Sequence, residues 1–307
     1  MAGLQDIQDA LKDIHAGKVL YDEPMSRHTS LNVGGHADAL VFIENENQLV
    51  EVVRRLREKK IKYFTAGNLT NVIVRDGGFR GVILCMTEMK DVRFENMPGK
   101  GYFISAQAGA SMAKVISRLL TEELTGLEFC AGIPGSVGGA VWMNAGAYGK
   151  EMKDVVQEVY VLDTAGVKKT MNRNEISFNY RHTDFPDGTI ILGTRFKLEK
   201  GERSKIKIRI NEIMQWRQEK HPLEYPSAGS IFKNLPGQPS GKLIEEMGLK
   251  GMTKGGAQIS PKHANFIINK GNATASDILS LIELVQAQAQ KEKGLRLETE
   301  VVIIGEN

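Results

Sequence analysis

The chain has 307 residues and a formal net charge of +3, with 41% hydrophobic and 25% charged residues. This is the composition of an ordinary soluble globular protein, and the length suits two or three domains because single cores rarely grow past about 250–300 residues. So small a net charge gives no argument for nucleic-acid binding, although it is compatible with an anionic small substrate.

The cysteines and the N-terminus favour a cytoplasmic protein. Cys85 and Cys130 lie in apolar surroundings without metal-ligand spacing, so we expect buried free thiols and no metal site. The N-terminal residues are acidic and amphipathic, unlike a signal peptide. No apolar run approaches the roughly 20 residues of a membrane span, so we expect no membrane insertion.

The N-terminal part of the chain predicts short strands interleaved with helices. Apolar periodicity predicts a helix over 4–14, Asn45 with Gln48 predicts the capped start of a second, and Ser111 starts a third. Apolar and β-branched runs predict strands at 61–65, 72–74, 102–109, 155–162, 167–171 and 189–198.

The composition changes at 199–220, where basic residues alternate with apolar ones at helical spacing. This predicts a long amphipathic helix with Ile206, Ile210, Ile213 and Met214 on its apolar face. Its basic face is either a polyanion site or, more commonly, a solvated surface. Further helices are predicted from Ser240 and from Thr274 to Gly294, and strands at 257–260, 264–268 and 297–304.

Two glycine-rich stretches are candidate phosphate cradles. Residues 131–149, AGIPGSVGGAVWMNAGAYG, offer consecutive backbone N–H groups around Gly135–Gly139 with little side chain in the way. The apolar residues of this stretch favour a buried, ligand-facing loop over a surface turn. Residues 66–71 are a weaker candidate, which is neither a Walker A loop nor a Rossmann fingerprint.

Three polar positions are candidates for chemistry: Arg181 beside an aromatic residue, Ser230 on a turn of small residues, and Glu300 in the predicted strand 297–304. Alternation along that strand places Glu300 on a partly apolar face, where a carboxylate commonly has a partner or a raised pKa. The simpler interpretations stay open: a surface arginine, a serine-rich turn and a solvated edge strand.

Four sequence motifs follow one another along the chain. They are GIPGSVGGAVWMNAGAYG (132–149), NYRHT (179–183), PSAGSIFKN (226–234) and LETEV (297–301). In this order they resemble motifs of the UDP-N-acetylenolpyruvoylglucosamine reductase family, in its shorter second type. The resemblance covers about residues 25–305.

This resemblance implies an α+β protein. A two-lobed FAD-binding domain of the vanillyl-alcohol-oxidase type would span residues 1–200, with lobes of about 1–85 and 86–200, and a C-terminal α/β substrate-binding domain would span 201–307. The implied enzyme uses FAD, with NADPH as co-substrate, to reduce the enolpyruvyl ether of UDP-N-acetylglucosamine to UDP-N-acetylmuramate in peptidoglycan precursor synthesis. Another FAD-dependent oxidoreductase on this scaffold, acting on a sugar or alcohol, is the alternative.

The resemblance also implies roles for individual residues. Arg181, Ser230 and Glu300 match catalytic positions, with Ser230 as the proton donor. Implied cofactor-binding residues are Gly67, Asn68, Thr70, Asn71, Gly132, Gly135, Ser136, Gly138 and Gly139. Implied substrate-binding residues are Tyr180, Lys220, Lys233, Asn234 and His263.

The sequence departs from the family pattern at three places. Leu69-Thr70 stands where Gly-Ser is usual, Thr183 where Ser is usual, and Leu235 where Pro is usual. The Leu69 side chain must therefore turn away from the cofactor diphosphate. No departure removes an implied catalytic group.

Overall fold

The structure is a computed structural model that describes residues 3–12, 14 and 17–307. The chain forms two compact units, each discontinuous in sequence. Unit 1 comprises Met1–Leu20, Ala39–Asn68 and Gly81–Trp216, and unit 2 comprises Tyr21–Asp38, Leu69–Arg80 and Arg217–Asn307. The expected domains, 1–200 and 201–307, are continuous. The compact units differ from them because two early segments bury Leu31, Val33 and Ile73 in the core of unit 2.

Unit 1 contains most of the strands, and β1, β2, β5 and α5 each run across a boundary between the units. Its elements are α1 (Leu4–Leu11), β1 (Val19–Pro24), β2 (His36–Phe42), α2 (Glu46–Glu58), β3 (Tyr63–Ala66), β5 (Phe79–Cys85), β6 (Val92–Met97), β7 (Gly101–Gln107), α3 (Met112–Thr121), β8 (Leu124–Thr125), α4 (Val137–Trp142), β9 (Gly146–Ala147), β10 (Lys150–Glu151), β11 (Val156–Leu162), β12 (Lys168–Asn172), β13 (Phe178–Asn179), β14 (His182–Thr183), β15 (Ile190–Lys200) and α5 (Arg203–Lys220).

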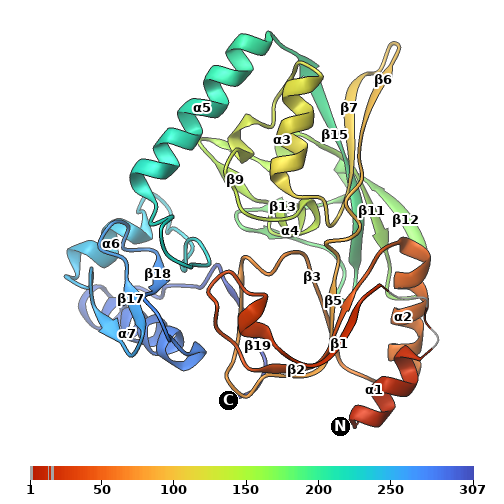
Figure 1. The fold of residues 1–307 in the computed structure, drawn as a ribbon. Coiled ribbons are helices and arrows are strands. Elements are labelled where there is room, and N and C mark those ends of the chain that lie inside the picture. Colours follow the sequence, from red (N-terminus) through yellow and green to blue (C-terminus); the bar gives the residue numbers. More distant parts are fainter. Residues whose placement is uncertain (1–2, 13, 15–16) are drawn as a thin grey trace. The chain divides into compact units, whose positions relative to one another are not determined.

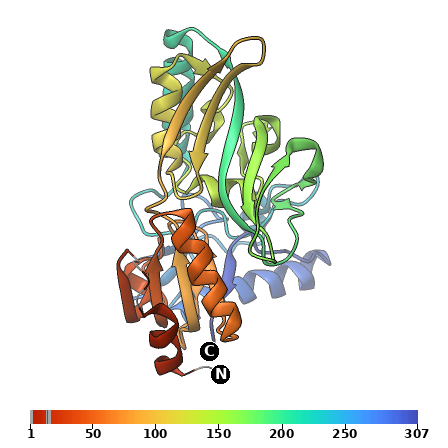
Figure 2. The same cartoon turned by 90° about the vertical axis from the view of Figure 1, so that its right-hand side faces the viewer.

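Two sheets organise unit 1 (Figure 1). The larger sheet has the order β12-β11-β15-β7-β6, with β8 also paired to β15, and α3 and α4 share one apolar core with it. The smaller sheet has the order β1-β2-β5-β3 and is mixed, since β3 and β5 are parallel. Helices α1 and α2 pack beside this smaller sheet through a separate apolar core (Figure 2).

Unit 2 is built around the long C-terminal helix. Its elements are β4 (Val72–Val74), α6 (Ser240–Glu246), β16 (Thr253–Lys254), β17 (Ala257–Ile259), β18 (Ile267–Asn269), α7 (Ala275–Lys293) and β19 (Val302–Ile304). Strands β16, β17 and β18 form an antiparallel sheet, and β19 pairs in parallel with β4. The apolar face of α7 is buried in this core.

The predicted helix caps are confirmed. Asn45, Ser111 and Thr274 each accept a hydrogen bond from a backbone N–H in the first turn of α2, α3 and α7. Helix α7 ends at Gly294, whose φ of 65° lies in the left-handed region that favours glycine. These ends are specified locally, so sequence alone places them well.

Other elements differ from their predictions. Helix α1 ends at Leu11, before the expected end at residue 14, and residue 13 of that prediction lies outside the described residues. Met214 is 45% exposed, so its predicted place on a buried face is wrong. The predicted strand 297–304 is reduced to β19, because the residues just before β19 bond to the segment around Phe232.

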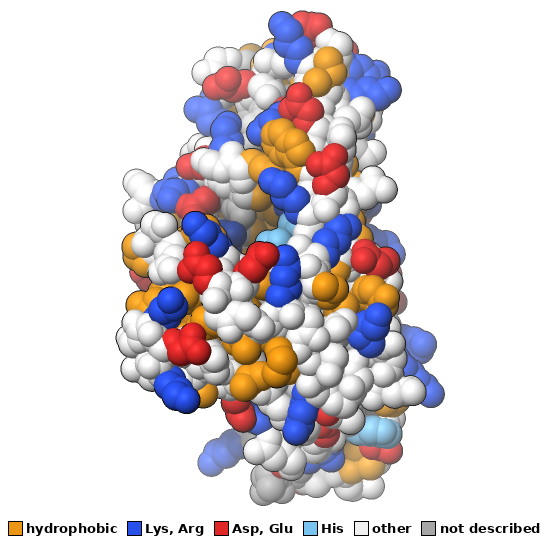
Figure 3. Space-filling view, turned by 90° about the vertical axis from the view of Figure 1, so that its left-hand side faces the viewer, with side chains coloured by type: hydrophobic (Ala, Val, Ile, Leu, Met, Phe, Trp, Pro, Cys, Tyr) orange, Lys and Arg blue, Asp and Glu red, His pale blue; other side chains and the backbone are white. Residues whose placement is uncertain are grey.

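The basic face of α5 carries charges of both signs. Lys205 pairs with Glu202 at 2.9 Å, and Arg209 pairs with Glu212 at 3.0 Å. Figure 3 shows Lys and Arg side chains intermingled with Asp and Glu on the pictured face. The solvated interpretation of this helix therefore fits the structure better than a polyanion site. Among the described residues, no helix combines the length and apolar character that a membrane crossing needs.

Asp76 stabilises the start of α7. Its carboxylate accepts hydrogen bonds from the backbone N–H groups of Ala275 and Ser276 at 2.9 and 2.8 Å. Burial alone would raise the Asp76 pKa, but the hydrogen bonds from Ser276 and Ala275 outweigh it and lower this pKa below its ordinary value. We expect Asp76→Ala to reduce the free energy of unfolding by about 1–2 kcal/mol in urea titrations. Because the folded-state pKa is lowered, the difference from wild type should shrink as the pH falls below about 4. Equal urea midpoints at pH 7 would contradict the assignment.

Candidate functional site

The two glycine-rich stretches meet in unit 1, where Gly67 lies against Ser136. A Cβ atom on Gly67 would overlap Ser136 Oγ and lie 2.9 Å from Ser136 Cβ. The stretch around Ser136 is fixed in turn by its pairing with the start of α3: Met112 N–H donates to Gly135 O at 3.0 Å, and Val137 N–H donates to Ala110 O at 2.9 Å. Residue 67 must therefore be glycine, because Ser136 leaves no room for a Cβ atom there.

A pocket of about 190 Å³ lies at this junction. It is lined by Asn68, Thr87, Lys90, Gly109, Ser111, Lys114, Gly135 and Ser136. Ser111 and Ser136 are the N-caps of α3 and α4, so two helix starts with their partial positive charge border the pocket. Lys90 and Lys114 in the lining add positive charge, which Glu88 partly offsets through its 2.6 Å ion pair with Lys90. A diphosphate matches this combination of helix starts and cations.

Only some of the predicted cofactor residues line this pocket. Asn68, Gly135 and Ser136 do. Gly138 donates its backbone N–H to Ala108 O at 2.8 Å, and Gly139 donates its own to Ser136 Oγ at 3.4 Å. These two N–H groups therefore hold the loop together, contrary to the expected run of donors open to a phosphate.

The other predicted cofactor residues are not among the residues that line this pocket. Gly132, with φ of 71°, lies earlier in the same stretch, in unit 1. Thr70 and Asn71 belong to unit 2, where Ser30 Oγ donates to Thr70 O at 3.1 Å and Asn71 Nδ2 donates to Glu300 O at 3.0 Å. Cofactor contacts by these residues stay predictions.

The unusual Leu69 lies in a strained backbone conformation. Its φ is 54°, which glycine adopts freely and a leucine only at a cost of order 1–3 kcal/mol. Its side chain is only 4% exposed, so hydrophobic burial offsets that cost. This explains how the chain tolerates leucine where the family pattern has glycine.

Sequence reasoning missed five residues of the pocket lining, namely Thr87, Lys90, Gly109, Ser111 and Lys114. Ser111 was recognised only as a helix cap, although a cap that follows Ala-Gly at a strand end is a signal for an anion site. Gly109 carries a second signal, since a Cβ there would overlap Met86 O. The lysines gave no usable signal, because most lysines are solvated.

Arg181 lies in the turn between β13 and β14 in unit 1. Its φ of 52° is in the left-handed region, which is sparsely populated for arginine and typical of functional turns. Arg181 Nη2 donates to Gly146 O at 2.9 Å, and its guanidinium carbon lies 5.0 Å from the ring centroid of Tyr180. The turn thus presents an oriented cation beside a 44% exposed Tyr180.

Buried Asn144 and Thr183 tie this turn to the glycine-rich stretch. Asn144 Nδ2 donates to Asn179 O at 2.9 Å, and Thr183 Oγ1 donates to Val141 O at 2.9 Å. Asn144 is fully buried, and its Oδ1 accepts from Lys153 N–H at 3.0 Å. The Arg181 turn and residues 131–149 therefore form one hydrogen-bonded assembly.

Ser230 and Glu300 are brought together in unit 2. Glu300 N–H donates to Ile231 O at 2.7 Å, and Phe232 pairs with Thr299 in an antiparallel bridge. Ser230 is half-buried and follows Gly229, whose φ is 75°. Within the described part of the chain, the Ser230 hydroxyl has no hydrogen-bond partner.

The predicted substrate residues have varied surroundings. Lys220 is exposed at the last turn of α5, and Lys233 Nζ lies 3.3 Å from Glu298 Oε2. Asn234 Oδ1 accepts from Ser240 N–H at 3.0 Å and so supports the start of α6. His263 is packed against His221 and Phe266, with ring centroids 5.8 and 4.9 Å away.

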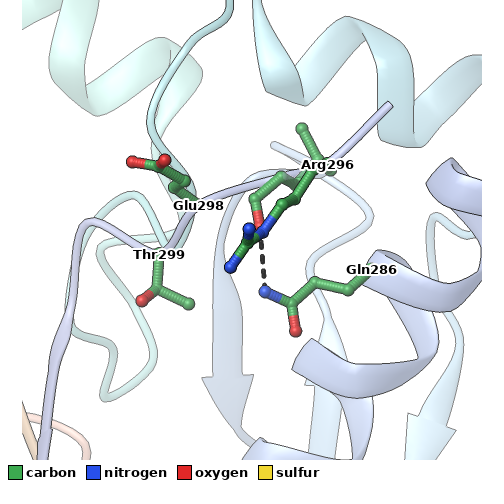
Figure 4. A pocket seen from close by; sticks show the side chains of 5 residues that line it. Gln286, Arg296, Glu298 and Thr299 are labelled. Carbon is green, nitrogen blue, oxygen red and sulfur yellow. Dashed lines mark hydrogen bonds between the residues drawn. The ribbon is translucent and has the colours of Figure 1, made fainter. Parts of the chain in front are cut away.

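Unit 2 has a pocket of its own, with a volume of about 320 Å³. Four of the residues that line it directly precede Glu300 in the sequence. It is lined by Gln286, Arg296, Leu297, Glu298 and Thr299. Figure 4 shows Gln286 and Arg296 side by side, with the Glu298 carboxylate directed away from them. Gln286 Nε2 donates to Leu297 O at 2.9 Å, which fixes the chain that leads to Glu300.

Comparisons with known proteins identify the family. A model of the C-terminal domain of UDP-N-acetylenolpyruvoylglucosamine reductase matches residues 221–304, and an FAD-binding domain model matches residues 37–171. The UDP-N-acetylenolpyruvoylglucosamine reductase of Syntrophus aciditrophicus is 47% identical over 301 residues, covering 98% of this chain and 96% of that protein. The chain belongs to the UDP-N-acetylenolpyruvoylglucosamine reductase family.

Solved structures agree with this family. The UDP-N-acetylenolpyruvylglucosamine reductase from Thermus caldophilus is 33% identical with a TM-score of 0.78, covering 93% of this chain and 98% of that chain. A VAO-type flavoprotein from Myceliophthora thermophila is 11% identical with a TM-score of 0.51, covering 65% of this chain and 48% of that chain, and it shows the shared fold. The predicted α+β fold and the FAD cofactor are confirmed.

The Gly67–Ser136 contact yields a prediction for the reductase. Gly67→Ala should raise the Kd for FAD by at least about tenfold and lower the melting temperature, because its methyl group displaces Ser136. The Gly67→Ala/Ser136→Gly double variant removes both colliding atoms, and glycine is itself a tolerated cap. The double variant should therefore recover most of the FAD affinity in fluorescence titrations. If it binds FAD as weakly as Gly67→Ala, steric overlap is the wrong explanation.

The histidine pair of unit 2 gives a pH prediction. Burial, helped by the positive charge of Arg217, lowers the pKa of His221 to about 4. The unfolded chain then binds a proton that the folded chain rejects, so stability should fall as the pH drops from about 6.5 to 4. His221→Phe keeps a ring against Phe266 and cannot titrate. Urea titrations at pH 7 and pH 5 should show a smaller stability loss in this variant, and an equal loss would contradict the assignment.

Proposed function

We propose that this protein reduces UDP-N-acetyl-3-O-(1-carboxyvinyl)glucosamine, the enolpyruvyl ether of UDP-N-acetylglucosamine, to UDP-N-acetylmuramate with NADPH as the electron source. The observation that carries the proposal is the match to this reductase family over nearly the whole chain, and the resemblance of the motifs that contain Arg181, Ser230 and Glu300 supports it. The pocket beside Gly67 and Ser136 is suited to the FAD diphosphate. FAD, when bound, supplies the hydride carrier between NADPH and the terminal vinyl carbon of the substrate.

The proposed role of Arg181 is to hold the substrate carboxylate. Hydride addition to the vinyl group builds negative charge on the neighbouring carbon and on this carboxylate. A guanidinium can donate hydrogen bonds to both carboxylate oxygens in a bidentate pair and stabilise that charge as it develops. The bond from Arg181 to Gly146 O orients the guanidinium in advance, which reduces the cost of binding.

The proposed role of Ser230 is to donate a proton to the carbon that carries this charge. A serine hydroxyl is a weak acid, so it suits only a strongly basic acceptor, and an enolate carbon is one. A hydroxyl without a hydrogen-bond partner among the described residues is available for that acceptor. Glu300, held by its backbone against Ile231, is proposed to share in stabilising the enolate when its carboxyl is protonated or when it bridges through a neighbouring group, because an ionised carboxylate would repel that charge.

The reaction is tested with the purified flavoprotein under anaerobic conditions. Flavin reduced by NADPH should be reoxidised rapidly by the enolpyruvyl substrate, and slowly by oxygen in a separate aerobic run. Rapid reoxidation by oxygen, with no response to the enolpyruvyl substrate, would contradict the proposal and favour an oxidase that acts on a sugar or alcohol.

Ser230→Ala separates the two half-reactions. Reduction of the flavin by NADPH should be unchanged, while reoxidation by the enolpyruvyl substrate should slow by about 10²–10⁴, the usual effect of losing a general acid. Ser227→Ala changes a hydroxyl in the same turn and serves as the matched control. Stopped-flow absorbance of the flavin reports both steps, and an equal slowing of both steps by Ser230→Ala would exclude the proton-donor role.

A further inference from the structure

A buried asparagine, Asn265, bonds the segment that follows Ser230 through both polar atoms of its side chain and through its backbone carbonyl. Asn265 Oδ1 accepts from Phe232 N–H at 2.9 Å, and Asn265 Nδ2 donates to Phe232 O at 2.8 Å. The backbone carbonyl of Asn265 accepts from Ile231 N–H at 2.8 Å, and its N–H donates to His263 Nδ1 at 3.2 Å. The residue is only 3% exposed.

The pairing with Phe232 has the form of a short β-ladder made by a side chain. A primary amide offers a donor and an acceptor in one plane without needing to be protonated, so it satisfies both backbone atoms at neutral pH. Phe232 and Ile231 are 1% and 0% exposed, and an unpaired polar group at such depth costs about 1–3 kcal/mol. The amide is therefore required by the segment and is no incidental core residue.

The same segment is held from its other side by the chain at Glu300. Ile231 O accepts from Glu300 N–H at 2.7 Å, and Glu300 O accepts from Asn71 Nδ2 at 3.0 Å. Ile231 is thus bonded through its N–H to Asn265 and through its carbonyl to Glu300. The serine lies one residue before this doubly anchored position, directly after the left-handed Gly229.

We propose that Asn265 is the positioning residue that sets the place of the Ser230 hydroxyl relative to Glu300. It acts through the backbone of Ile231 and Phe232 and does not touch the substrate. This inference rests on the proposed role of Ser230 as proton donor. General acid catalysis needs the donor within hydrogen-bond reach of the acceptor carbon, so a small displacement of the segment slows protonation far more than it weakens binding.

The test replaces the amide with a near-isosteric carboxylate. In its ionised form, the carboxylate of Asn265→Asp keeps the acceptor for Phe232 N–H, loses the donor, and sets an oxygen against Phe232 O, so the rates are measured at alkaline pH, where ionisation is favoured. In anaerobic stopped flow we expect unchanged flavin reduction by NADPH and at least about tenfold slower reoxidation by the enolpyruvyl substrate, with its Kd within about threefold of wild type. Asn265→Ser, which keeps at most one of the two bonds, guards against a folding failure of Asn265→Asp and should slow the same step only.

Asn269→Asp is the matched control. Asn269 is also buried in unit 2, and it bonds Leu31 O through Nδ2 at 2.9 Å and Gly271 N–H through Oδ1 at 2.9 Å. This variant loses the same kind of bond away from Ser230, so it should be destabilised without slower reoxidation. If Asn269→Asp slows reoxidation as much as Asn265→Asp, the effect is one of general stability and the proposal fails.

A double variant distinguishes positioning from damage elsewhere. If Asn265 acts only through Ser230, adding Asn265→Asp to Ser230→Ala should cause no further slowing of reoxidation. If the double variant is slowed by the product of the two single-variant effects on the reoxidation rate, the inference is wrong. Failure of this inference is also separable from failure of the proposed function: wild-type reoxidation by the enolpyruvyl substrate tests the function alone, whereas normal kinetics in Asn265→Asp contradict only the role of Asn265.

Discussion

The backbone at residue 67 passes so close to Ser136 that only a hydrogen atom fits on it. Ser136 also caps α4 and pairs with Ser111, the cap of α3. The two glycine-rich loops and the starts of α3 and α4 therefore meet at Ser136. Their partial positive charges and two lysines then face one pocket. The candidate cofactor site of unit 1 follows from this close packing, and the Arg181 turn is bonded to the same glycine-rich stretch.

Unit 2 uses a different device, in which asparagine amides substitute for missing strand partners. Asn265 pairs with Phe232, and Asn71 holds the carbonyl of Glu300. These bonds fix irregular chain segments at defined positions without a regular sheet. Irregular chain held in this way leaves side chains such as Ser230 accessible while their backbone stays buried and satisfied.

Sequence reasoning succeeded where structure is decided locally. The caps at Ser111 and Thr274 and the glycine end of α7 follow from residues a few positions apart. It failed where distant segments decide. The strand expected at 297–304 is interrupted because its first half bonds to residues near Phe232, and β6, a half-exposed edge strand, has too little apolar periodicity to be recognised. Gly67 was a weak candidate alone and gained its meaning only beside Ser136, while Lys90 and Lys114 carry no motif at all.

The central claim is that the two glycine-rich stretches form the walls of the FAD diphosphate site. A crystal structure of the purified flavoprotein tests it most directly. The account predicts diphosphate oxygens within about 2.7–3.2 Å of backbone N–H groups beside Gly67 and Ser136, with Lys90 or Lys114 close by. A diphosphate bound elsewhere in the protein, with this pocket filled only by water, would contradict the account.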